Sequence, residues 1–188
     1  MKKLIKMLSL VAISTIFIVG CSSSKNSDNL YLSNCPDNMT EMGKKYFVNN
    51  LEAGNYKVEF TAKEYEYGIL KKEHTLYKST IEHNENNTLK IGVTDKEKSD
   101  SNLNVIINDS EYGGYTLNCL KDGYNTGIAM SILNEDKYFN LDNEVALAVY
   151  SVGGENRTTN GLNIDEEFEI SDNNLTDLIV YMRLHKIN

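Results

Sequence analysis

The stretch Tyr56–Lys63, YKVEFTAK, decides the fold class of this 188-residue chain. Its apolar side chains, at positions 56, 58, 60 and 62, alternate with Lys57, Glu59, Thr61 and Lys63. Because successive side chains of a β-strand point to opposite faces, this alternation predicts a strand with one face buried and one in water. The alternation breaks at residues 64–66, where continuing it would bury two glutamates, so we expect a bulge or the end of the strand there.

Alternating apolar residues recur along the rest of the chain at intervals of roughly ten residues, a spacing typical of antiparallel sheets. They predict further strands around residues 70–81, 89–93, 103–107, 115–119, 128–132, 145–149 and 178–184. Gly- and Asn-rich segments predict the turns between them, including one at Gly113–Gly114. These about eight short strands predict an all-β fold, an antiparallel β-sandwich or barrel-like domain.

Two segments depart from this alternation. Met39–Leu51 has weak helical spacing and could be a short helix or an irregular lead-in to the sheets. Asp165–Ile170, DEEFEI, could be one helical turn with acids at its N-terminus or an acidic loop. Neither provides the long amphipathic helices that alternate with strands in parallel α/β proteins, so we do not expect that class.

The first residues, Met1–Cys21, have the organisation of a secretory signal. Lysines at positions 2, 3 and 6 precede an uncharged stretch from Met7 to Val19, which is too short to span a bilayer. The stretch ends in Ile18-Val19-Gly20-Cys21, which resembles the lipobox of bacterial lipoproteins. The lack of Trp and the abundance of Asn, Lys, Ile and Tyr resemble proteins of low-GC Gram-positive bacteria.

The lipobox resemblance implies that residues 1–20 are a signal peptide and that the Cys21 thiol carries a diacylglyceryl group, with further acylation such as palmitate. Two acyl chains would anchor the mature protein firmly to the extracytoplasmic face of the cell membrane. The Ser/Asn/Asp-rich composition of the following residues predicts a flexible, lipidated tether over 21–37, which leaves 38–188 as a single β-rich domain. An ordinary cleaved signal with an incidental cysteine is the alternative.

The net charge limits the partners. The chain carries −8, and removal of the signal with its three lysines and no acids would leave −11. Such a surface repels phosphate backbones, so we expect no nucleic-acid partner. The acidity could serve solubility alone, or it could attract cationic peptides or metal ions.

The two other cysteines, Cys35 and Cys119, could form a disulfide in an exported protein, or Cys119 could be a buried free thiol. The histidines are His74, His83 and His185. They are scattered among predicted strands and turns, so we expect all three on the surface. No nucleophile motif or phosphate-binding loop is visible in 38–188, so we expect no catalytic residue, no cofactor and no enzyme activity.

Acidic residues between Asp165 and Asp177 could bind Ca²⁺, but they lack the glycine and the distal glutamate of an EF-hand loop, so a solvated acidic loop is favoured over a metal site. Tyrosines close to predicted turns could form a binding surface or could reflect β-propensity alone. The candidates are Tyr65, Tyr67, Tyr112 and Tyr115.

The sequence therefore predicts a lipid-anchored surface protein whose β-domain binds a protein, peptide or envelope component without catalysis. One alternative is an immunity-type lipoprotein that sequesters a cationic peptide. Another is an envelope hydrolase with a site assembled in space, which would bring a histidine together with Asp or Glu in a cleft.

Overall fold

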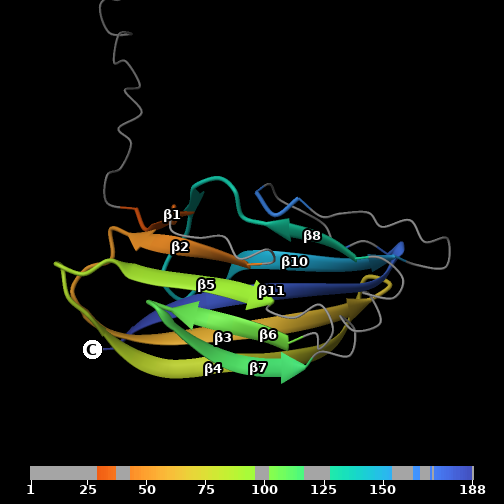
Figure 1. The fold of residues 1–188 in the computed structure, drawn as a ribbon, viewed down its shortest axis with the longest axis horizontal. Coiled ribbons are helices and arrows are strands. Elements are labelled where there is room, and N and C mark those ends of the chain that lie inside the picture. The colour runs from red at the N-terminus through yellow and green to blue at the C-terminus, as the bar shows by residue number, and fades with distance from the viewer. Residues whose placement is uncertain are drawn as a thin grey trace, which may run out of the picture.

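The computed structural model describes residues 29–36, 43–95, 102–116, 128–153, 163–165, 170 and 172–187. Over these residues the protein is all-β and consists of two antiparallel sheets (Figure 1). The first sheet has the order β7-β6-β5-β2-β1-β9, and the second has the order β4-β3-β11-β10-β8. Among the described residues, no helix is long and apolar enough to cross a membrane.

The six strands of the first sheet are short. They are β1 (Tyr31–Asn34), β2 (Gly43–Asn49), β5 (Leu89–Asp95), β6 (Asn102–Ile107), β7 (Ser110–Thr116) and β9 (Lys137–Tyr138). The second sheet contains the three longest strands. Its strands are β3 (Gly54–Glu66), β4 (Ile69–His83), β8 (Ile128–Ile132), β10 (Val145–Gly153) and β11 (Asn174–Ile187).

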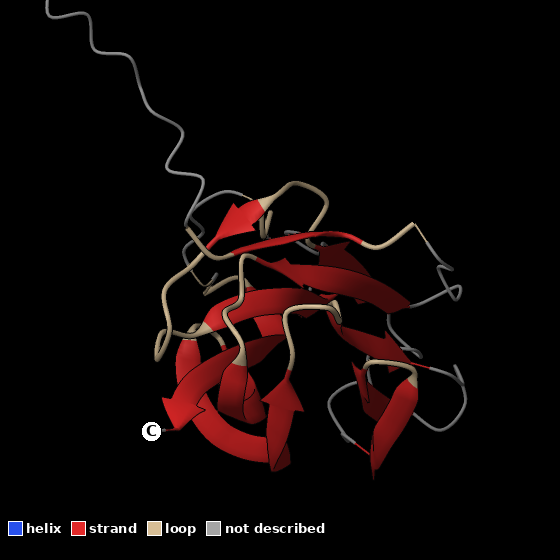
Figure 2. Ribbon diagram, turned by 90° about the vertical axis from the view of Figure 1, so that its left-hand side faces the viewer, coloured by secondary structure: helices blue, strands red, loops and turns tan. Residues whose placement is uncertain are grey.

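The core lies between the two sheets, which curl around it as layers (Figure 2). Val58 and Phe60 of β3 are fully buried, as are Leu184 of β11 and Ile91 of β5. Alternation thus puts one face of each sheet into a common apolar layer, as the stretch Tyr56–Lys63 predicts. The eight predicted strands correspond to β3–β8, β10 and β11.

A tyrosine joins the two layers. Tyr46 of β2 crosses the core, and its hydroxyl donates a hydrogen bond of 3.1 Å to the backbone carbonyl of Leu147 in β10. Burial raises the pKa of Tyr46, since the ionised phenolate would lose its hydration. The hydroxyl thus remains a neutral donor that satisfies a carbonyl in the core.

The expectation of a helix or irregular lead-in at Met39–Leu51 is wrong over residues 43–49, which form β2. Lys44, Tyr46 and Val48 point inward, and the strand pairs with both β1 and β5. Its polar residues weaken the alternation in the sequence, and pairing on both edges determines the strand instead.

The predicted tether over 21–37 is too long at its C-terminal end. Tyr31–Asn34 form β1 between β2 and β9, with Leu32 completely buried. The domain therefore begins before residue 38, because Leu32 completes the core at this end of the first sheet.

The turn predicted at Gly113–Gly114 is also misplaced. Ile107 pairs with Ser110, so the turn is Asn108–Asp109, with Asn108 in the left-handed region at φ 55°. Gly113 lies inside β7 at a register shift, where its φ of 130° suits a bulge. Of the predicted strand at 115–119, residues 117–119 lie outside the described residues.

Replacing Leu32 by alanine tests whether β1 belongs to the domain. The loss of a fully buried leucine should lower the free energy of unfolding by about 2–5 kcal/mol, measured by urea denaturation. Asn29→Ala, at an exposed side chain two residues before β1, is the control and should change stability by less than about 0.5 kcal/mol. Equal stability of the two variants would show that Tyr31–Asn34 belong to the tether and not to the domain.

Candidate functional site

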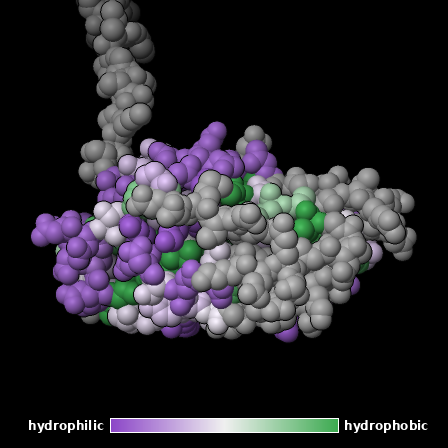
Figure 3. All heavy atoms as spheres, viewed as in Figure 1, coloured by the Kyte–Doolittle hydropathy of each residue, from purple (hydrophilic) through white to green (hydrophobic). Residues whose placement is uncertain are grey.

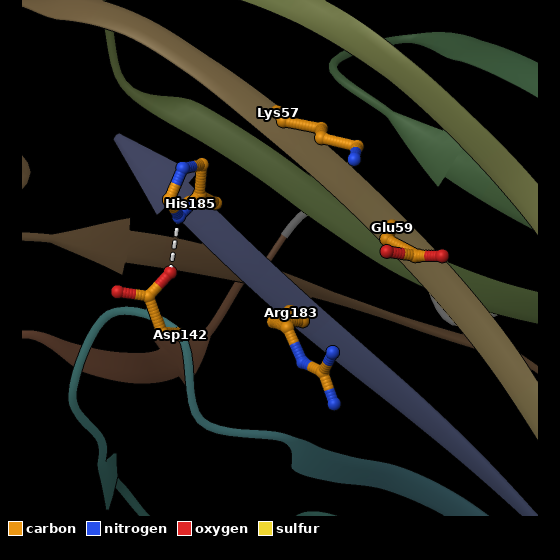
Figure 4. A pocket seen from close by; sticks show the side chains of 5 residues that line it. All are labelled: Lys57, Glu59, Asp142, Arg183 and His185. Atoms are coloured by element: carbon orange, nitrogen blue, oxygen red, sulfur yellow. Dashed lines mark hydrogen bonds and ion pairs between the residues drawn. The ribbon is translucent and has the colours of Figure 1, made fainter. Parts of the chain in front are cut away.

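A charged hollow lies on the outer face of the second sheet and has a volume of about 260 Å³ (Figure 4). Five residues line this charged hollow, namely Lys57, Glu59, Asp142, Arg183 and His185.

Strand register explains why these side chains meet. Lys57 of β3 pairs with His185 of β11, and Glu59 pairs with Arg183, so the four side chains share the face opposite to the core. Asp142 lies before β10, and its backbone N–H donates 2.8 Å to the carbonyl of Leu184, which extends the ladder beside β11.

Four of the five charged residues that line the hollow form ion pairs. Asp142 accepts from Nδ1 of His185, and Arg183 donates 2.9 Å to Glu144. Glu144 also accepts from Lys63 at 2.5 Å, while Glu59 pairs with Lys78 at 3.1 Å. The result is an ion-pair network on an open sheet face.

The His185–Asp142 pair is the arrangement that the hydrolase alternative predicts. Both side chains are more than half exposed, however, at 56% and 63%. The lining residues include no hydroxyl or thiol, and no segment among the described residues encloses the pair, whereas an active site stabilises charge by excluding water. The geometry favours a hydrated ionic surface. Among the described residues, no group of three His, Cys, Asp or Glu side chains could hold a metal ion.

The prediction of surface positions for all three histidines is wrong for His83. Its side chain is buried, and Nε2 lies 3.1 Å from the carbonyl oxygen of Leu51. His74 is partly buried beside Glu64, at 3.4 Å, and His185 is exposed. His83 is buried because it ends β4 opposite Gly54, against the loop that leads into β3.

The predicted tyrosine surface is divided between two places. Tyr65 is partly buried on β3 beside Tyr181, whereas Tyr67 lies exposed in the β3–β4 turn. Tyr112 of β7 packs against Tyr77 of β4, with ring centroids 4.6 Å apart. Tyr112 therefore closes the seam between the edge strands of the two sheets, far along β4 from the turn. The side chain of Tyr115 lies outside the described residues.

The β3–β4 turn carries a second candidate site. Glu66 pairs with Ile69, so the connection is the two-residue turn Tyr67–Gly68, with φ of 48° and 78°. Positive φ at both positions is typical of a type I′ turn, which suits the twist of a hairpin. The exposed fractions of Tyr67, Ile69 and Leu70 are 44%, 63% and 49%. We call these three residues the hairpin tip.

Sequence reasoning missed Ile69 and Leu70 as surface residues. The signal was present, because adjacent residues of a strand point to opposite faces and one of the two had to leave the core. Both are at the start of β4, before its first buried position at Leu76, so neither side chain reaches the core.

Other predicted site residues are placed only in part. Cys35 is buried, whereas Cys119 and Cys21 lie outside the described residues. Of the acidic candidates, Asp165 accepts hydrogen bonds from the backbone N–H groups of residues 134 and 135, and Asp172 is exposed. Residues 166–169 lie outside the described residues.

The chain was compared with known proteins by sequence and by fold. No family model, no curated protein and no solved structure matches it.

Proposed function

We propose that this protein is a lipoprotein held on the extracytoplasmic face of the cell membrane through Cys21. Its domain binds a protein, peptide or envelope component through the hairpin tip and does not catalyse a reaction. The observation that carries the proposal is the conformation of Tyr67, which is exposed and left-handed.

The conformation of Tyr67 is costly for its residue type. A non-glycine residue with a Cβ pays about 1–2 kcal/mol in the left-handed region, and type I′ turns strongly prefer Asn-Gly or Asp-Gly. Its backbone N–H donates 3.2 Å to the carbonyl of Asn174, but any residue other than proline could make that bond. An exposed tyrosine in a strained turn supports a role in recognition, since folding alone favours Asn at this position.

The composition of the hairpin tip supports contact with another molecule. Tyr67 offers an amphipathic ring at low entropic cost, and Ile69 and Leu70 add apolar area that water covers in the free protein. Lys71 and Lys72 follow immediately, both exposed. Lys71 pairs with Glu66 at 3.4 Å, and Lys72 lies opposite Glu64 in the hairpin, so charges of both signs flank the apolar tip.

The position of the hairpin tip suits a protein anchored at its N-terminus. Tyr31 pairs with Asn49, so the chain enters at the end of the molecule where β2 ends and β3 begins (Figure 1). The described surface at this left-hand end is largely hydrophilic in Figure 3. The 13 residues of β3 then extend roughly 40 Å to the opposite end, where the tip lies. Ser22–Leu30 could span at most roughly 30 Å, so an anchor at Cys21 would leave the tip pointing away from the membrane.

The two alternatives gain less support. Sequestration of a cationic peptide rests on the net charge of −11 after processing, whereas the tip is flanked by charges of both signs and the charged hollow contains its own cations. A hydrolase would use His185 and Asp142, which lie in open solvent. A deletion strain with unchanged sensitivity to antimicrobial peptides would remove the first alternative, and a His185→Gln variant with full biological activity would remove the second.

Replacing Tyr67 by asparagine tests the role of the tip. Asparagine accepts the left-handed conformation, so the free energy of unfolding should stay equal or rise by about 0.5–1 kcal/mol. Affinity capture from envelope extracts, with the chain from Asn29 onward as bait, should lose at least ten-fold in recovered partner.

Tyr138→Asn is the matched control. Tyr138 is a more exposed tyrosine, at 58%, on the edge strand β9 at the other end of the molecule. This variant should recover the partner at the wild-type level. Equal recovery by the Tyr67 variant and the wild type, or equal loss in both variants, would refute recognition by the tip.

Replacing Cys21 by alanine tests the anchor. Without the thiol no diacylglyceryl group can be attached, so the variant should fail to incorporate labelled fatty acid and should leave the membrane fraction or remain an unprocessed precursor. Membrane attachment together with cleavage after Gly20 in the variant would contradict lipidation at Cys21.

A further inference from the structure

A lysine amine points into the protein beside a carboxamide. Lys44 is an inward-facing residue of β2, and its side chain is among the buried polar groups, at 8% exposure. Its Nζ lies 2.9 Å from Oδ1 of Asn134, which directly follows β8 and Leu133. The two residues are 90 positions apart and come from different sheets.

The surrounding hydrogen bonds fix the orientation of Asn134. Its Nδ2 donates 2.9 Å to the carbonyl of Ile132, so Oδ1 is directed to the amine. The backbone N–H donates 2.7 Å to Oδ1 of Asp165, and the backbone carbonyl accepts 2.5 Å from Nδ2 of Asn34. Asn134 is thus held on its backbone and on its side chain, with the carboxamide oxygen against Nζ, while the residue as a whole is exposed.

The local charges suit an amine that reacts as a nucleophile. Burial lowers the pKa of Lys44, because the ammonium form loses hydration, and the charge of Asp165 opposes this shift. A desolvated lysine has a larger neutral fraction, which is the form that attacks carbonyl carbons. Fixed geometry replaces a bimolecular encounter by an intramolecular one, with a large gain in effective concentration.

We propose that Lys44 and Asn134 join in an intramolecular isopeptide bond. The Nζ–Cγ bond forms, the Cγ–Nδ2 bond of Asn134 breaks, and the nitrogen leaves as ammonia. The Lys44 nitrogen gives up two protons through the Asp165 carboxylate: one completes the leaving ammonia and the second protonates it, so one ammonium ion replaces another. No oxidant, reductant or co-reactant is consumed.

The two sheets are not joined to each other by strand pairing, and the bond would link them covalently. It would link β2 of the first sheet to the segment after β8 of the second, and it would close a long loop of the chain. Such a closure restricts the unfolded chain in the way a disulfide does, but it resists reductant.

Peptide mapping of the purified full chain by mass spectrometry tests the bond. We expect one branched peptide containing both Lys44 and Asn134, with a mass about 17 Da below the sum of its two parts because ammonia has left. Trypsin should no longer cleave after Lys44. Two separate unmodified peptides would overturn the proposal, whatever the behaviour of any variant.

Variants distinguish the bond from other losses of ammonia. Lys44→Met should restore the full mass, whereas Lys45→Met should keep the branched peptide, since Lys45 faces outward and pairs with Asp109. Loss of ammonia that persists in the Lys44 variant would indicate succinimide formation at Asn134 and would overturn the proposal.

The Asp165→Asn variant tests whether Asp165 acts as a proton carrier or only positions Asn134. The asparagine retains an oxygen that can accept the two backbone N–H groups, but it cannot take up a proton. After refolding, branched peptide should form at least ten-fold more slowly than in the wild type. Formation at the wild-type rate would overturn the role of Asp165 as the proton carrier.

Discussion

The pairing of β3 with its two neighbours is the constraint on which the rest of this structure depends. β3 pairs along its whole length with β4 on one edge and with β11 on the other. The alternation of β3 matches β11 throughout and matches β4 up to Phe60, where the first of two register shifts occurs, and the apolar residues of the three strands form one surface against the first sheet. A shift of one residue in either pairing would bury Lys57 and Glu59 and expose Val58 and Phe60.

The same register determines what the surface can do. It puts Lys57, Glu59, Arg183 and His185 side by side on the solvent face, where the last three each pair with a charged residue outside this group. It also carries the β3–β4 hairpin to the end of the molecule opposite to the point of chain entry. The scaffold thus presents an ionic face and an apolar tip. Among the described residues with positive φ other than glycine, the tip carries a tyrosine, whereas the others are Asn or Asp, which tolerate this conformation better.

Period-two alternation predicted the fold class and the eight long or strongly apolar strands, because each of these buries one face. It failed for β1, β2 and β9. These strands are short or rich in lysine and asparagine, and their neighbours in the sheet determine them more than their own composition does. The glycines at 113 and 114 predict a turn incorrectly, because a glycine at a bulge and a glycine at a turn look alike in a sequence.

The candidate sites were harder to predict than the fold. Tyr67 stood out beside a glycine, and the adjacent pair Ile69 and Leu70 could have been recognised as partly exposed. The charged hollow and the contact between Lys44 and Asn134 could not, since each joins residues that are distant in the sequence and follow no motif. Their proximity follows from the order and the register of the strands in the two sheets.

Amide hydrogen exchange of the domain, alone and with envelope extract, tests recognition by the hairpin tip most directly. The account predicts slower exchange on addition of extract at residues 66–72, while exchange at residues 57–59, 142–144 and 183–185 stays unchanged. Slower exchange around the charged hollow, with residues 66–72 unaffected, would contradict it.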